Sequence, residues 1–517
     1  MGFIEWVTKV NDAINGFVWV KIGLVLLIGT GILMTVLTKF FQVTHIKEWW
    51  TQTIGGIFKK GSNVRKNKEE GSVSQFQALC TALAATIGTG NIAGVSSAIC
   101  VGGPGAVFWM WIAAFFGMMT NFSENVLGIY YRRKNKDGEW SGGPMYYLRD
   151  GLGSYKGCKW VGRVLAVLFS IFAVLASFGI GNMGQINKIV INLDSAILKN
   201  VDLGYAFGDV KWTSIIIGTV LMIIGGLIIL GGLSRIAAFA ERVIPFMAIA
   251  YIIGSLVVIC AHISQIGAMF AAIFKFAFGV KAVAGGITGI AIKEVITQGC
   301  KRGVFSNEAG LGSSVMVHSA SNVREPVKQG MWGIFEVFMD TLVVCTMTAI
   351  VVLSSGMIDL ETGLMVEGAN DATLVADSFG NIFGPAGSIF VSLAILLFAF
   401  TTVVGWSHYG TKAFEYLFGI KAAKGYKVFF VLMMISGAIM TSSLAWDISD
   451  TFNGLMMVPN LIGVLALSPL VMKITKNYVD RRIKHLDVAP ILSYNPEIEA
   501  DHAIDIENEI KMSADVK

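Results

Sequence analysis

The chain has 517 residues, of which 54% are hydrophobic and 15% are charged, and its mean hydropathy is +0.66. Soluble domains carry about 25% charged residues, so this composition excludes an ordinary soluble protein and indicates an integral membrane protein. The formal net charge of +5 is too small to indicate a nucleic-acid partner. The six cysteines have no CxxC spacing and no histidine cluster beside them, so we predict apolar packing residues rather than disulfides or a metal site.

Eleven apolar segments approach the length of about 20 residues that a membrane-spanning helix needs. The first is too long for the core of a signal peptide and has no small-residue cleavage site after it, so we predict that it stays as a membrane helix. The predicted fold class is therefore an all-α integral membrane protein with about eleven transmembrane helices. The predicted spans cover about 17–41, 76–101, 107–131, 161–189, 212–233, 243–262, 266 onwards, 330–353, 384–409, 428–445 and 455–474.

The second span contains a cluster of glycines and polar residues at its centre. A membrane helix satisfies its own backbone hydrogen bonds, so such a cluster predicts a helix that is broken at mid-depth and lines a cavity for a small polar ligand. Close packing of helices through small residues is the alternative, which explains the glycines but not the threonines and the asparagine. The cluster consists of Thr86, Gly88, Thr89, Gly90, Asn91 and Gly94.

The seventh span is also interrupted, by glycines and a lysine between Gly279 and Gly289. Without the first span, ten spans remain, and two sets of five must run in opposite directions through the membrane. Interrupted helices at matching positions of two halves indicate the central site of a secondary transporter. We therefore predict an N-terminal extra helix with a basic loop over 1–75, five-helix repeats over 76–262 and 263–476, and a polar tail over 477–517.

The positive charges predict the orientation. Lysine and arginine gather in the loops after the first, third, fifth, seventh and ninth spans and in the tail, whereas the loop over 354–381 has several acids and no lysine or arginine. Loops rich in cations stay in the cytoplasm. We predict a multi-pass protein of the cell membrane, with its N-terminus outside and its C-terminus in the cytoplasm.

Three motifs carry a family resemblance: ATIGTGNIAG at 85–94, SGGPMYYL at 141–148 and KRGVFSNEAGLGS at 301–313. With the eleven-span plan, they resemble the alanine or glycine:cation symporter family over nearly the whole chain. The resemblance implies the leucine-transporter (LeuT) fold, which has a five-plus-five inverted repeat with two broken helices. It also implies sodium-driven uptake of small neutral amino acids, chiefly alanine and glycine and sometimes glutamine or serine.

A bound amino acid needs donors for its carboxylate and acceptors for its ammonium group. A half-helix that begins near Gly90 would present free N–H groups and the positive end of its dipole to the carboxylate. Thr89 and Gly90 match the carboxylate-binding position of the family, while Asn91 either holds the break together or contacts the substrate. Asn182 and Gln185 lie on one helical face and offer amides for the substrate, or for hydrogen bonds between helices.

Aromatic side chains are the predicted walls that select a small substrate. Phe276 and Phe278 precede the second predicted break, and Trp406 lies one turn beyond a pair of threonines. Aromatic residues that face lipid are common as well, so the alternative is that these rings lie on the outer surface.

The predicted sodium site combines backbone carbonyls freed by the break with two adjacent hydroxyls, as the resemblance implies. The alternative is that the threonines bond back to their own helix. The predicted ligands are the carbonyls of Ala84, Ile87, Gly88 and Phe398 and the hydroxyls of Thr401 and Thr402.

Three ionisable residues within spans, Glu124, Glu336 and Asp340, are functional candidates. They lie near the predicted cytoplasmic ends of their spans, so we favour structural or gating roles, with a proton relay as the alternative. Asn307 and Glu308 are predicted to shape the inner gate, and His408 to be an interface residue.

Rival functions receive less support. Proton-coupled symport is the alternative within the same class, and a channel is a further one. An intramembrane enzyme lacks a constellation of nucleophile, base and orienting group, and the chain has no Walker sequence or HExxH motif and no correctly spaced dinucleotide fingerprint. The predicted partners are alanine or glycine, sodium and the lipid bilayer, with no cofactor beyond the co-transported ion, and nothing in the sequence requires an oligomer.

Overall fold

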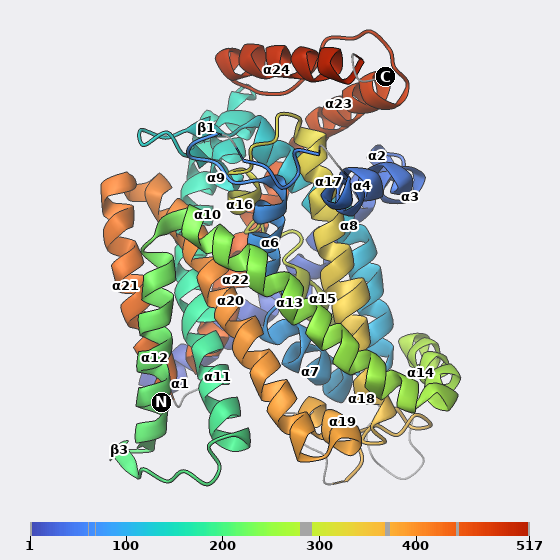
Figure 1. Ribbon diagram of the computed structural model, residues 1–517, viewed down its shortest axis with the longest axis vertical. Helices are drawn as coiled ribbons and strands as arrows, with labels where there is room; N and C mark the ends of the chain where they lie inside the picture. Colours follow the sequence, from blue (N-terminus) through green and yellow to red (C-terminus); the bar gives the residue numbers. More distant parts are fainter. Residues whose placement is uncertain are drawn as a thin grey trace.

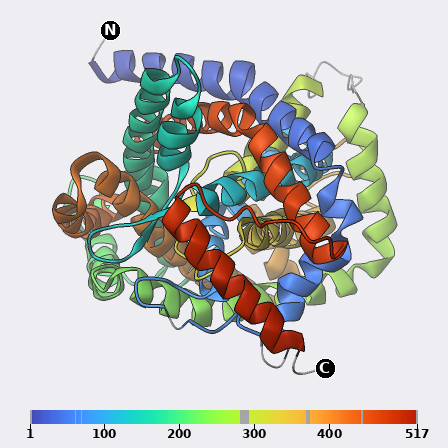
Figure 2. The same cartoon turned by 90° about the horizontal axis from the view of Figure 1, so that it is seen from above.

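The computed structural model describes residues 3–59, 62–67, 69–279, 292–367, 373–440 and 444–514. It is a bundle of helices, most of which run along the long axis of the molecule (Figure 1). The N-terminal helix lies along the outside of this bundle in the view from above (Figure 2).

This N-terminal helix begins earlier than predicted. α1 (Phe3–Gly16), the π-helical η1 (Phe17–Gly23) and α2 (Leu24–Leu37) form one apolar helix over Glu5–Leu37. The first turns carry charged residues and have little hydropathy, which is why the apolar run alone starts at residue 17. Three short helices follow: α3 (Phe41–Thr44), α4 (Ile46–Gln52) and α5 (Ile54–Phe58).

The second predicted span is a broken helix, as predicted. α6 (Gln75–Thr86) and the segment of η2 (Thr89–Asn91) and α7 (Ala93–Gly102) meet at an angle of 61°. Ser74 and Gln77 form a capping box that starts α6. The polar cluster therefore lies at a bend between two half-helices.

Within the described residues, seven helices are long and apolar enough to cross a membrane, or nine if each of two bent pairs is one span. α21 (Ile420–Ala438) carries three lysines near its start and α14 (Ile266–Phe278) has only 13 residues, so neither meets that test. The other helices of the bundle are α8 (Gly105–Tyr130), α10 (Lys159–Phe178) continued by η5 (Gly179–Met183) and α11 (Gly184–Ala196), α12 (Trp212–Ile229), α13 (Gly232–Ala261), α14 (Ile266–Phe278), α15 (Ile292–Asn307), α17 (Pro326–Val337) continued by η7 (Phe338–Cys345) and α18 (Thr346–Ser354), α20 (Pro385–Phe418), α21 (Ile420–Ala438), and α22 (Leu444–Ala466) bent by 59° into α23 (Ser468–Tyr478) and η8 (Val479–Ile483).

The second interruption was predicted between Gly279 and Gly289. Of the predicted segment, residues 280–291 lie outside the described residues. The structure shows another interruption between α15 and the short helix α16 (Val315–His318), where Glu308, Gly310 and Gly312 have positive φ angles of 56°, 92° and 74°. This interruption lies against the α6–α7 break, because a Cβ atom built on Gly90 would lie 3.3 Å from the Ser306 Cα at the end of α15.

Short elements lie in the connections. Two small antiparallel sheets pair β1 (Arg133–Lys134) with β2 (Trp140–Ser141) and β3 (Tyr205–Phe207) with β4 (Val210–Lys211). The remaining short helices are α9 (Pro144–Tyr146), η3 (Tyr147–Gly151), η4 (Leu152–Ser154), η6 (Ile263–Gln265) and α19 (Leu374–Phe383). The tail predicted to be simply polar forms helix α24 (Pro496–Ala514), which crosses one end of the bundle (Figures 1 and 2).

Small residues allow α20 to approach the broken helix closely. A Cβ atom on Gly405 would lie 2.9 Å from the Ala85 Cβ, so the two helices touch along their backbones. This contact places Thr401 and Thr402, one turn earlier on α20, beside the end of α6.

Candidate functional site

The break in the first half-helix pair is fixed by one asparagine. The last helical hydrogen bond of α6 joins the Ile87 N–H to the Leu83 carbonyl at 2.8 Å, and the next N–H, of Gly88, donates instead to Asn91 Oδ1 at 2.9 Å. The last carbonyls of a helix have no helical partner. The carbonyls of Ala84 and Ile87 therefore lie at the open end of α6, and both residues are buried.

Thr402 faces this open end. A Cβ atom on Gly88 would lie 2.5 Å from Thr402 Oγ1, so only a glycine fits there without movement. Thr401 and Thr402 each donate from Oγ1 to the Phe398 carbonyl at 2.9 Å, which is the back-bonding that was the alternative to a ligand role. A hydroxyl that donates its hydrogen keeps lone pairs on oxygen. The Thr402 oxygen is thus available to a cation beside Gly88.

The amides of η5 and α11 approach the break at one point. Thr89 Oγ1 donates to Gln185 Oε1 at 3.1 Å, whereas Asn182 Nδ2 donates to the Phe430 carbonyl of α21 at 2.7 Å. Asn182 Oδ1 is buried and has no hydrogen-bond partner among the described residues. The structure therefore brings Gln185 to Thr89 and ties the amide nitrogen of Asn182 to the neighbouring helix.

The three predicted aromatic walls lie in different places. Trp406 is buried, lies against Gly181 of η5 and donates from Nε1 to Glu308 Oε1 at 2.8 Å. Phe276 packs against Gly105 and Gly363, and Phe278 is 59% exposed, with its ring 5.1 Å from that of Phe108 at the start of α8.

The aromatic ring that approaches Gly90 is Phe305, because a Cβ atom built on Gly90 would lie 3.3 Å from Phe305 Cδ1. Phe305 belongs to the motif at 301–313, so a signal for it existed. Because its neighbours in the sequence are polar, the segment was predicted to be a loop outside the membrane.

Asp340 joins both interrupted segments, a role that its predicted position did not indicate. It lies midway along the helix from Pro326 to Ser354, not near one end. Its Oδ1 accepts from Asn91 Nδ2 at 2.7 Å, and its Oδ2 accepts from Ser306 Oγ and Thr341 Oγ1, both at 2.8 Å. All of these side chains are buried, so one carboxylate holds the α6–α7 break and the end of α15 in one network.

The second interruption is held by buried polar side chains. Glu308 accepts from Trp406 and also from Ser313 Oγ at 2.5 Å, and Asn307 Nδ2 donates to Thr341 Oγ1 at 2.9 Å. The polar residues at 307 and 308 therefore lie inside the protein, with exposures of 0% and 4%.

Asn460 of α22 reaches the same interruption. It donates to the Gly310 carbonyl at 2.8 Å and to Glu124, and Tyr147 donates to its oxygen. Sequence reasoning missed both Asn460 and Tyr147. The signal for Asn460 was a polar residue in an apolar span, and that for Tyr147 was its place in the motif at 141–148.

The oxygen donors at the break are carbonyls and hydroxyls. Within the part of the chain that the structure describes, no group of three or more His, Cys, Asp and Glu side chains could hold a metal ion. Hard cations prefer oxygen ligands. The donor set thus fits an alkali cation.

The comparisons with known proteins identify the family of the chain. The model of the sodium:alanine symporter family matches residues 4–490. The chain belongs to the sodium:alanine symporter family. This is a family of membrane transporters, and the chain's apolar helices make it a multi-pass membrane protein.

Relatives in this symporter family cover nearly the whole chain. The sodium/alanine symporter AgcS of Methanococcus maripaludis is 41% identical over 93% of this chain and 98% of its own length. The probable sodium/glutamine symporter GlnT of Bacillus subtilis is 36% identical over 90% of each chain. The putative sodium/proton-dependent alanine carrier protein YrbD of the same organism is 35% identical over 92% of this chain and 93% of its own.

A solved structure shows the fold of the family member described here. MhsT, crystallised in complex with L-phenylalanine, matches with a TM-score of 0.50 over 79% of this chain and 99% of its own, at 15% identity. MhsT has the leucine-transporter fold, which contains broken helices, and the match shows this fold for the chain described here.

Proposed function

We propose that this protein carries a small neutral amino acid, alanine or glycine, into the cell together with sodium by alternating access. The α6–α7 break carries the proposal, because a positive helix end, an open set of carbonyls and a threonine hydroxyl meet there. The curated relatives named as sodium/alanine and sodium/glutamine symporters support it. The family is one of transporters, and we propose no enzymatic reaction.

The N-terminal end of η2 and α7 is the proposed carboxylate site. The first N–H groups of a helix have no helical partner and lie at the positive end of its dipole, so they attract an anion. Thr89 and Gly90 occupy this end and are buried. Gln185, bonded to Thr89, offers an amide to the ammonium or carboxylate group. Asn182, whose amide oxygen is buried and has no partner among the described residues, offers a second acceptor.

Tight packing around Gly90 supports a small substrate. A Cβ atom at this position would lie 3.3 Å from both Phe305 Cδ1 and Ser306 Cα, which leaves little room beside the backbone. Trp406, fixed by Glu308, is the proposed wall on the η5 side. We also propose Phe276 and Phe278 as aromatic walls. Their contacts with Gly105 and Phe108 place them beside the start of α8.

Sodium is proposed to bind between the end of α6 and α20. The carbonyls of Ala84, Ile87 and Gly88 would face the Thr402 hydroxyl, with Thr401 and the Phe398 carbonyl beside it. Sodium bound there would draw α20 towards the break and order the N–H groups that meet the substrate. The coupling must be reciprocal, so alanine strengthens sodium binding by the factor by which sodium strengthens alanine binding.

Proton coupling is the second candidate, favoured by Asp340. Among the described residues, the hydrogen-bond donors to this buried carboxylate are the neutral side chains of Asn91, Ser306 and Thr341. A buried carboxylate without a cation partner is costly unless it binds a proton or a metal ion. Uptake that follows a pH gradient in sodium-free buffer would favour this candidate.

The proposed arrangement has eleven crossings, with five-helix repeats over 76–262 and 263–476 after the extra helix of 1–75. The loops that carry the excess of cations share the end of the bundle on which α24 lies, in line with a cytoplasmic C-terminus and an outside N-terminus (Figure 1). We propose a cell-membrane location and a monomer as the working unit.

Counterflow of labelled alanine into liposomes, with and without a sodium gradient, tests the proposal. Uptake should require sodium, and a competition series of alanine, glycine, serine and glutamine should rank the substrates. Gly90→Leu should abolish alanine binding, whereas Gly29→Leu, where a Cβ atom meets nothing within 4 Å, should not. Uptake that is indifferent to sodium, or normal transport by Gly90→Leu, would contradict the proposal.

A substitution at the threonine pair separates ion binding from substrate binding. Thr402→Val keeps the shape of the side chain and removes an oxygen ligand of the ion. The sodium concentration for half-maximal uptake should therefore rise about tenfold or more, the scale of losing one hydrogen bond to a charged group. Thr219→Val is the control, because the Thr219 hydroxyl donates to the Ile215 carbonyl of its own helix at 2.7 Å.

A further inference from the structure

The C-terminal helix α24 lies over the connections at one end of the bundle. One face of it is buried: Ile498 packs on a small apolar cluster with Val73 and Trp140, and His502 and Ile506 are 3% and 4% exposed. Residues four apart lie on the same face of a helix. α24 is therefore docked by a continuous face and does not merely trail from the last membrane helix.

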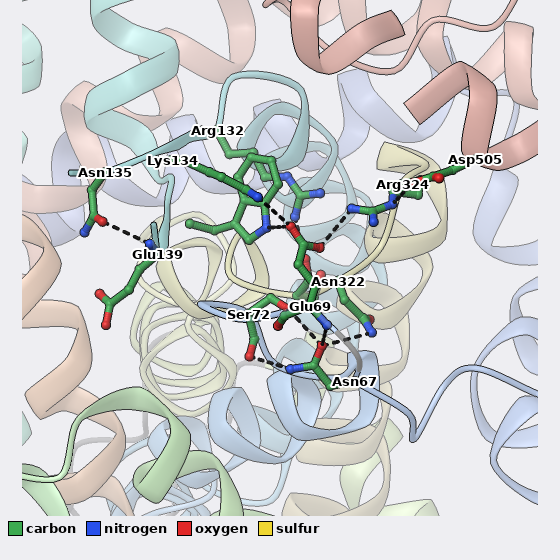
Figure 3. A network of polar contacts seen from close by, with 12 residues as sticks. Asn67, Glu69, Ser72, Arg132, Lys134, Asn135, Glu139, Asn322, Arg324 and Asp505 are labelled. Atoms are coloured by element: carbon green, nitrogen blue, oxygen red, sulfur yellow. Dashed lines mark hydrogen bonds and ion pairs between the residues drawn. The ribbon is translucent and has the colours of Figure 1, made fainter. Parts of the chain in front are cut away.

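An ion-pair chain leads from α24 into these connections (Figure 3). Asp505 accepts from Arg324 Nε at 2.8 Å, and Arg324 donates in turn to Glu69 Oε2 at 2.9 Å. Glu69 also accepts from Lys134 at 3.0 Å and from Trp140 Nε1 at 3.1 Å. Burial alone would raise the pKa of Glu69, but the Lys134 hydrogen bond and the Arg324 charge hold it below its usual range.

The same connections hold the N-terminal end of α6. The Val73 N–H donates to the Ala320 carbonyl at 3.0 Å, and the Asn322 N–H donates to the Val73 carbonyl at 2.8 Å. Val73 leads through the Ser74 cap into α6, whose far end is the break. Residues 320–324 follow α16, which continues from the second interruption. The outer ends of both interrupted segments are thus tied together directly beneath α24.

We propose that α24 is a latch that clamps the outer ends of α6 and of the α16 segment through Arg324 and slows the opening of the candidate site towards this end of the molecule. Opening in this direction requires α6 to move away from residues 320–324. While Asp505 and Glu69 hold Arg324 from two sides, that movement must break an ion pair and lift the buried face of α24. Alternating access, the proposed function, gives this movement its role.

Cys80 is a native probe of the movement, because it lies on α6 and is 1% exposed. The full-length protein with its other five cysteines replaced by serine is reconstituted in liposomes, and the rate of Cys80 modification by a small thiol reagent is measured for Asp505→Asn. We expect the rate to rise about two- to fivefold, the effect of losing one partly exposed ion pair. Asp501→Asn is the matched control, since Asp501 lies on the exposed face of the same helix.

Hydrogen exchange gives a second measurement on the same variants. The amides of Val73 and Asn322 should exchange faster by the same factor in Asp505→Asn, and faster still in a chain that ends at Asn495. Should the shortened chain fail to fold, Asp505→Asn decides alone. Equal Cys80 and amide rates in Asp505→Asn and Asp501→Asn would overturn the latch. Neither readout needs a transported substrate, so failure of alanine uptake would count against the proposed function and not against the latch.

Discussion

Asn91 Nδ2 donates to Asp340 Oδ1 at 2.7 Å, while Asn91 Oδ1 accepts from the Gly88 N–H at 2.9 Å. One amide therefore closes the break in the α6–α7 segment and anchors it to the middle of the α17–α18 helix. Ser306, at the end of α15, bonds to the other oxygen of the same aspartate. The two interrupted segments thus share a single carboxylate.

Replacement of Asp340 by asparagine tests this shared role. Asp340→Asn would place an amide where three donors converge, so at least one donor loses its acceptor. Hydrogen bonds to a charged group are worth about 1.5–3 kcal/mol, so sodium-driven alanine uptake should fall by roughly ten- to a hundredfold. Asp209→Asn, in an exposed loop, is the control. Full activity of Asp340→Asn would show that the carboxylate charge is not needed.

A single methyl group at Gly88 tests the contact with α20. In Gly88→Ala the new Cβ would lie 2.5 Å from Thr402 Oγ1, so the Thr402 side chain or the helix that carries it must move. Overpacking of this kind costs about 1–3 kcal/mol, and we expect a clear loss of sodium affinity together with a lower melting temperature. Gly94→Ala, on the same broken segment, meets nothing within 4 Å and should behave as the wild type. Similar sodium affinities in both variants would contradict the proposed ion site.

The first break was predictable because its glycines and polar residues stand inside an otherwise apolar run. The interruption over Glu308–Gly312 was not, because its neighbours Lys301, Arg302 and Asn307 make the segment look like a loop in water. The fold buries it all the same, since Trp406, Ser313 and Asn460 satisfy its polar groups. Hydropathy measures the composition of a segment and not the partners that distant helices supply.

Aromatic residues were the least predictable part of the site. Phe278 ends the apolar helix α14 and Phe305 lies within the mixed helix α15, yet one is 59% exposed and the other approaches Gly90. Which face of a helix meets the centre depends on the packing of its neighbours, and a lipid-facing ring has the same sequence pattern as a ring in the core. For α24, in contrast, the sequence carries a pattern that indicates one buried helical face: Ile498, His502 and Ile506 recur every four residues.

The bond between Trp406 and Glu308 should stabilise the folded protein. Trp406→Phe keeps an aromatic ring but removes the Nε1 donor, which leaves Glu308 with one hydrogen-bond donor fewer in a buried place. The loss should cost about 1–3 kcal/mol of unfolding free energy. Thermal unfolding in detergent measures it, with Trp212→Phe, at a side chain that is 48% exposed, as the control.

The double variant Trp406→Phe/Glu308→Gln completes that test. If the two side chains act as a pair, the effects of the single changes should not add, and the coupling should exceed about 0.5 kcal/mol, as for residues in contact. Additive effects would mean that Trp406 stabilises the protein by packing on Gly181 alone.

The docking of α24 on the bundle should weaken as the pH falls, because His502 becomes protonated. Burial and the positive charges of Arg132 and Arg324 lower the pKa of His502 to about 3, against a smaller opposing effect of Glu69. In the undocked helix His502 would titrate near its ordinary pKa of about 6.5. Protonation therefore favours the undocked state, and the contribution of His502 to docking is complete above about pH 6.5 and is lost as the pH falls towards 3. Each pH unit in this window favours release by up to about tenfold.

Cys80 modification and amide exchange at Val73, corrected for their intrinsic pH dependence, should rise about tenfold between pH 7.5 and pH 5.5 in the wild type and remain level in His502→Gln. The same pH dependence in both proteins would show that His502 does not control the docking of α24.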